Sequence, residues 1–150
     1  GGAERTFDSA AFVTALRLWH PALVEYDPTP RGVKRFANRA RLMTLYERLS
    51  AEGASRPAMA EVQVVAVTAI HQVEPALLDR WASERHLSEP DGTAHGLGWS
   101  AATFKPADQA AAARQTLLLE CINKHCTLNG EPGADDIDRL RRRMQDVKVR

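Results

Sequence analysis

Apolar residues recur along this chain at the three- and four-residue spacing that gathers them on one face of a helix. The first such pattern follows Asp8 and Ser9, either of which can cap a helix by accepting a backbone N–H. Pro21 falls late in the pattern and is expected to kink or end the helix, because proline lacks the N–H that an interior turn uses. The apolar positions of this first helix are Phe12, Val13, Leu16 and Trp19.

A second helix is predicted from about Pro30 to Ala51. Thr29 can cap it, and Pro30 suits a first turn, where a missing N–H costs nothing. Gly53 can serve as the C-terminal cap, because glycine adopts the left-handed conformation that often ends a helix. The apolar face of this helix consists of Val33, Phe36, Ala37 and Ala40.

A third segment, from Met59 to His71, is apolar nearly all round. The alternation of Val62, Val64 and Ala66 would also suit a buried strand. The length of the segment and the preceding Pro57 favour a buried helix.

Three further helices are expected to start at Pro75, at Pro106 and near Ala134. Residues 86–105 contain three glycines and little periodicity, which predicts a long irregular loop. The fourth helix carries Leu77, Leu78 and Trp81 as apolar positions. The candidate core positions of the fifth are Ala110, Ala113, Leu117, Leu118, Cys121 and Ile122.

These elements predict an all-α fold, a bundle of about six helices. The loop could divide it into a helical lid-like domain (1–85) and a C-terminal helical hairpin (106–150), with 86–105 between them. A hydrophobic share of 44% and a charged share of 26% are typical of a globular domain. No apolar run approaches the roughly 20 residues that cross a bilayer, and no signal peptide is visible. We therefore expect a cytoplasmic protein with no membrane contact in this segment.

Charge changes the interpretation of the second helix. The net charge of the chain is only +1, but residues 29–50 hold six basic residues and a single acidic one. Arg31, Lys34, Arg35 and Asn38 recur at the spacing of one helical face. Such a run is often a solvated surface. The alternative is a site for an anion at the start of the helix.

Residues that would catalyse a reaction by themselves are not recognisable. The sequence has no G-x-x-x-x-G-K-[ST] phosphate loop and no G-x-S-x-G elbow. None of the five histidines has a partner placed by its spacing, so no catalytic residue is predicted. Cys121 and His125 could bind zinc with His86 or His95, but a single close pair favours core packing, and no metal site is predicted.

The segment from Thr29 to Arg39, TPRGVKRFANR, resembles the Pro-Arg-x-x-Lys-Arg-Phe-x-Asn signature of KAP-type P-loop NTPases, which belong with the AAA+ and STAND-like ATPases. The resemblance extends over roughly residues 10–82. In that family the signature follows the nucleotide-binding core, and Pro30, Phe36 and Asn38 would be its structural positions. The start of the chain at Gly1-Gly2 rather than Met also leads us to expect a piece of a larger protein.

The resemblance implies a helical lid that closes over a nucleotide, as in AAA+ proteins with a sensor-2 arginine. By motif position, Arg31 would sense the phosphates, and Lys34 and Arg35 would be supporting or alternative contacts. ATP and Mg²⁺ would be held by a core that this chain lacks, so the chain would not be an enzyme on its own. The competing interpretation is an ion pair between Arg31 and Asp27 or Glu25 that shapes a turn.

Two alternative functions use other features of the sequence. The basic face, together with Arg139 and the run Arg141–Arg143, could bind nucleic acid, although aromatic residues for base stacking are few. Residues 106–150 could instead dock an effector or a second copy of the chain. The partners to consider are therefore the NTPase core of the same polypeptide, a homo-oligomer and, less favoured, nucleic acid.

Overall fold

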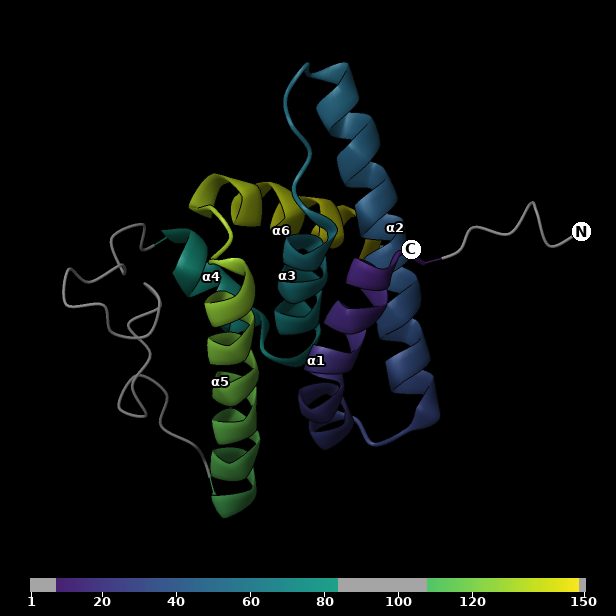
Figure 1. Ribbon diagram of the computed structural model, residues 1–150. Coiled ribbons are helices and arrows are strands. Elements are labelled where there is room, and N and C mark those ends of the chain that lie inside the picture. The colour runs from purple at the N-terminus through teal and green to yellow at the C-terminus, as the bar shows by residue number, and fades with distance from the viewer. Residues whose placement is uncertain (1–7, 84–107, 149–150) are drawn as a thin grey trace, which may run out of the picture.

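A computed structural model describes residues 8–83 and 108–148, and it confirms the all-α fold. Within those residues the chain forms six helices and no strand (Figure 1). The helices are α1 (Ala10–Tyr26), α2 (Pro30–Gly53), α3 (Glu61–Val73), α4 (Pro75–Ser83), α5 (Gln109–Asn129) and α6 (Ala134–Lys148). The predicted loop over 86–105 lies outside the described residues. The predicted helix start at Pro106 is too early, because α5 begins at Gln109 after Asp108, an extended residue that caps it.

Helix α3 is the centre of the bundle. It covers most of the segment for which a strand was the alternative, and it contacts each of the other helices. All residues from Val64 to Ile70 are buried, because neighbours surround the helix on every side. Figure 1 shows α1 and α2 on one side of α3, α5 on the other, and α6 crossing the bundle. The nearly uniform apolar sequence of α3 follows from this position.

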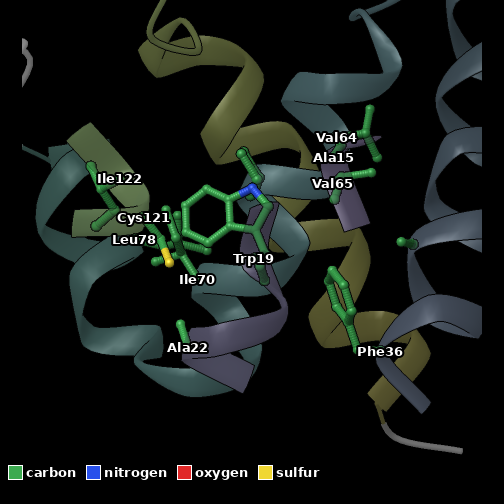
Figure 2. Close-up of a cluster of buried hydrophobic side chains, with 14 of the residues drawn as sticks. Ala15, Trp19, Ala22, Phe36, Val64, Val65, Ile70, Leu78, Cys121 and Ile122 are labelled. Carbon is green, nitrogen blue, oxygen red and sulfur yellow. The ribbon is translucent and has the colours of Figure 1, made fainter. Parts of the chain in front are cut away.

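Both halves of the chain contribute to one hydrophobic core. Trp19 of α1 is fully buried, and Figure 2 shows its indole ring between side chains of α3 and of α5. Leu118 and Ile122 of α5 and Ile137 of α6 belong to the same cluster as Trp19. Helices from both sides of residues 84–107 therefore pack into a single body.

The N-terminal caps of three helices are side-chain oxygens. Ser9 Oγ accepts the N–H of Phe12 at 3.0 Å and so caps α1, one of the two candidates that the sequence offered. Asp108 Oδ1 accepts the N–H of Ala111 at 2.8 Å and caps α5. Thr29 caps α2, as expected. Each cap satisfies a backbone donor that the first helical turn leaves unpaired.

Pro21 does not end the first helix, and a kink at this proline, the other outcome expected from the sequence, stays a prediction. Helix α1 continues to Tyr26 with Pro21 inside it. The turn that follows the proline carries Ala22 and Leu23, which are 1% and 2% exposed. Burial of these side chains in the core offsets the hydrogen bond that the proline removes.

The expected cap at Gly53 is also wrong. Gly53 is still helical, and the left-handed residue is Ser55, with φ of 54°. The N–H of Ser55 donates to the Glu52 carbonyl, and the N–H of Arg56 donates to the Ala51 carbonyl at 3.0 Å. This is the paired bonding of a Schellman motif, with serine where glycine is usual. The turn brings the Arg56 side chain back to α2, where it reaches Glu47.

Part of the predicted core face of α5 is exposed. Leu118, Cys121 and Ile122 are buried as expected, whereas Ala110 and Ala113 are exposed and Leu117 is half-buried. The N-terminal turns of α5 project beyond the other helices in Figure 1, so they have little to pack against.

Candidate functional site: the basic face of helix α2

The start of α2 is held by a short chain of hydrogen bonds. Asp27 Oδ1 accepts from Thr29 N–H at 3.2 Å and from Thr29 Oγ1 at 2.7 Å, and Thr29 Oγ1 accepts from Gly32 N–H at 3.1 Å. The bonds from Thr29 hold the pKa of the Asp27 carboxyl below its ordinary value. The connector between α1 and α2 is therefore a structured turn, and it fixes the position of the residues that follow.

Gly32 lies closely against Asp27 in this turn. A Cβ at position 32 would overlap the carboxylate of Asp27, with the Asp27 Cγ only 2.6 Å away. On the other side, Gln72 Nε2 of α3 donates to the Gly32 carbonyl at 3.2 Å. The glycine in TPRGVKRFANR is therefore explained by the close approach of Asp27.

The predicted site residues lie together on the exposed side of α2. Arg31, Lys34, Arg35 and Asn38 are all exposed, and they line one open pocket of about 340 Å³. Arg39 and Leu42 complete its lining.

Pro30 is the first residue of α2, and Phe36 is 1% exposed in the core. Asn38 Oδ1 accepts from Arg41 Nη1 at 3.0 Å, a bond within α2.

The competing interpretation of Arg31 as half of a local ion pair is not what the described residues show. The Asp27 carboxylate is engaged by Thr29, and neither Arg31 nor Lys34 has an ion pair within ranges 8–83 and 108–148. Arg35 lies close enough to Asp27 to contribute to its lowered pKa. The pocket thus presents cations whose charge the described part of the chain leaves largely uncompensated.

Arg39 and His71 were missing from the predicted site. Arg39 Nη2 lies 3.4 Å from His71 Nδ1, across the contact between α2 and α3. Arg39 could have been found from the sequence, because it is four residues after Arg35 and therefore near it on the helix. His71 could not have been found, because its place beside Arg39 depends on how α3 packs.

A second charged centre, which the sequence analysis did not identify, surrounds Glu47 of α2. This carboxylate has a side-chain exposure of 2% and accepts from Arg56 at 2.7 Å, from Arg139 of α6 at 2.9 Å and from Met59 N–H at 2.8 Å. Although burial acts against ionisation, these donors lower the pKa of Glu47 to about 2. Through these contacts Glu47 links the C-terminal half of α2 to α6 and to the α2–α3 connection.

The second basic cluster on the sequence is largely neutralised by partners. Arg139 pairs with Glu47 and Asp136, while Arg141 and Arg142 pair with Asp138. Arg143 lies over the ring of Tyr46, 5.1 Å from its centroid. Arg139, Arg141 and Arg142 are thus compensated by acidic partners, whereas the exposed Arg143 keeps its charge, so this cluster favours nucleic acid less than the basic face of α2 does.

The candidate zinc ligands of α5 are buried in the core. His125 is buried, and its Nε2 lies 2.8 Å from Gln63 Oε1 of α3. Burial lowers the pKa of His125 to about 4, so the ring is neutral at pH 7. In the described ranges no three His, Cys, Asp or Glu residues are arranged to hold a metal ion. His86 and His95, the other zinc candidates, lie outside those ranges.

Comparison with known proteins found no family model, no characterised protein and no solved structure that matches this chain. In the described part of the chain, no helix is both long and apolar enough to cross a membrane. Any function must therefore be argued from the residues and geometry given above.

Proposed function

We propose that this chain is the helical lid and C-terminal regulatory region of a larger KAP-like P-loop ATPase, and that α2 responds to the nucleotide state. The observation that carries the proposal is the pocket that Arg31, Lys34 and Arg35 share on the first turns of α2. Multiply charged phosphate is the ligand that suits such a group of cations, because guanidinium groups bind its oxygens in a bidentate way.

The contrast with other arginines of this protein supports an external ligand. Arg41 pairs with Asp8 at 2.8 Å, and Arg141 pairs with Asp138 at 2.7 Å. These two surface arginines thus have carboxylate partners within the fold, whereas Arg48, for example, has no ion pair among the described residues. The basic face of α2 also lacks such partners in the described chain, although Asp27 lies at its base and is committed to the helix cap instead.

The side chains of the pocket fit phosphate and do not fit Mg²⁺. Cationic groups repel a divalent cation, which prefers carboxylate and phosphate oxygens. Mg²⁺ and the nucleotide would therefore be held by a separate NTPase core, where the cation would neutralise phosphate charge during hydrolysis. The residues of this chain would contribute by binding phosphate oxygens from the lid.

A phosphate contact made from a lid depends on closure. When Arg31 contacts a terminal phosphate only in the closed arrangement, binding of the triphosphate favours closure, and loss of that phosphate removes the bias. The capped turn at Asp27 and Thr29 fixes the backbone at the start of α2, so a movement of α1 and α2 on closure also carries Arg31.

The test uses the full-length ATPase with Arg31→Gln. We expect ATP turnover and nucleotide-dependent assembly to fall, because charge at the phosphate is lost. Arg48→Gln is the matched control, since Arg48 is exposed on the same helix but does not line the pocket. Unchanged turnover and assembly in Arg31→Gln, or an equal loss in both variants, would refute the sensing role.

A further inference from the structure

Arg39 is the least compensated cation of the described chain that is also withdrawn from solvent. Its side chain is half-buried between α2 and α3, and its hydrogen-bond partner is a ring nitrogen of His71. Arg35, one turn earlier on α2, is near enough to act on it by repulsion. Burial and this repulsion both lower the pKa of Arg39, which means that the folded chain disfavours its charge.

Three other half-buried arginines in the described chain have carboxylate partners, and a fourth, Arg114, lies over the Tyr26 ring, 5.7 Å from its centroid. Arg56 and Arg139 both reach the carboxylate of Glu47. Arg141 reaches the carboxylates of Asp79 and Asp138. Withdrawing a guanidinium from water without an anion costs free energy. An anion that is not part of the described fold would therefore complete the environment of Arg39.

The position of Arg39 shows where that anion would lie. Arg31, Arg35 and Arg39 follow one another at intervals of four residues, so they form a stripe that rises about 6 Å per step along α2. All three line the same pocket. Arg39 lies on the side of the stripe that faces α3, where the lower exposure strengthens electrostatic attraction.

We propose that Arg39 is a further phosphate ligand of this pocket and that His71 is the residue that positions it. Basic residues from successive turns of α2 line one open pocket of about 340 Å³, a volume that suits a compact polyphosphate, such as the triphosphate of a nucleotide, better than an extended nucleic-acid backbone. That the polyphosphate belongs to a nucleotide is an inference that rests on the proposed function. That the pocket binds polyphosphate is independent of it, because this binding requires no other domain.

The test is to titrate this chain with inorganic tripolyphosphate at low ionic strength and to measure the binding by isothermal titration calorimetry. Arg39→Gln is expected to weaken binding at least about tenfold, because a charged hydrogen-bond donor is lost. Arg39→Lys restores the charge but not the planar fork and should recover only part of the affinity. His71→Asn should weaken binding by a smaller factor. Arg48→Gln, outside the pocket, is the matched control and should bind like the wild type.

Thermal unfolding of the free variants distinguishes a ligand from a structural residue. Because Arg39 lacks a carboxylate partner in the described chain, Arg39→Gln should be as stable as the wild type or more stable. A clear loss of stability would show a structural partner and overturn the proposal. Absence of tripolyphosphate binding by the wild-type chain, or equal binding by Arg39→Gln and Arg48→Gln, would overturn it as well.

Two comparisons identify which hypothesis fails. If Arg31→Gln weakens tripolyphosphate binding and Arg39→Gln does not, the role of Arg39 is refuted while the lid function stands. If Arg39→Gln abolishes that binding while Arg31→Gln leaves turnover of the full-length ATPase unchanged, the lid function is refuted and the phosphate ligand stands. Duplex DNA that binds more tightly than tripolyphosphate at equal phosphate concentration would overturn the compact ligand.

Discussion

Replacement of Glu47 by glutamine tests how much the buried charged centre contributes to stability. Glutamine keeps the shape and the helix propensity of glutamate but removes the charge that Arg56 and Arg139 share. The pKa of Glu47 is about 2, against an ordinary value of 4.5. At about 1.4 kcal/mol per pH unit, this difference corresponds to about 3 kcal/mol of stability.

The two arginines reduce that figure. Their side chains are 25% and 31% exposed, so they regain some hydration when the carboxylate is gone. We therefore expect Glu47→Gln to lower the free energy of unfolding by about 2 kcal/mol at pH 7. Urea unfolding followed by far-UV circular dichroism measures this quantity. Glu52→Gln, at an exposed position of the same helix, should change it by less than about 0.5 kcal/mol.

The pH dependence gives a sharper result. The folded state lowers the pKa of Glu47, so its contribution is complete above pH 4.5 and is lost as the pH falls towards about 2. The stability difference between wild type and Glu47→Gln should shrink by about 2 kcal/mol, nearly its whole value, between pH 5 and pH 3. Groups present in both proteins, such as His125, cancel in this difference. A difference that stays constant with pH, or a cost no larger than that of Glu52→Gln, would refute the reasoning.

Two substitutions at helix ends should act in opposite directions. Gly32→Ala is expected to destabilise the chain by about 1–2 kcal/mol, because the new Cβ displaces the Asp27 carboxylate from Thr29, the cap of α2. Gly53→Ala meets nothing within 4 Å and should be neutral or stabilising. Equal midpoints of urea unfolding for the two variants would contradict this. Ser55→Gly is expected to stabilise by roughly 0.5–1 kcal/mol, since glycine adopts the observed positive φ without strain, and a lower melting temperature in differential scanning calorimetry would show that the Ser55 side chain has a role.

The helices could be predicted because their signals are local. Thr29 and Pro30 mark the start of α2 in any context, and the apolar length of α3 favours a helix over a strand. The wrong predictions concern helix ends that are determined by contacts between helices. Helix α1 passes through Pro21 because the core holds its last turn, a condition that no local pattern contains.

The candidate site also has a part that could be predicted from the sequence and a part that could not. The basic face of α2 follows from spacing along one helix, so Arg31, Lys34 and Arg35 could be placed together in advance. Contacts between helices could not be predicted. Glu47 meets Arg139, which is 92 positions away, and nothing in the sequence around either residue indicates the other.

The length of α2 has a mechanical consequence. The helix is a rod, with Arg31 near one end and the ion pair between Glu47 and Arg139 of α6 further along. Arg31 and Glu47 are 16 residues apart, a span of about 24 Å. If Glu47 acts as the pivot, a tilt of about 5° displaces the Arg31 end by about 2 Å over that span. Such a displacement is enough to make or break a hydrogen bond to a phosphate, so a small rotation at the α2–α6 junction would act as a lever on the basic face.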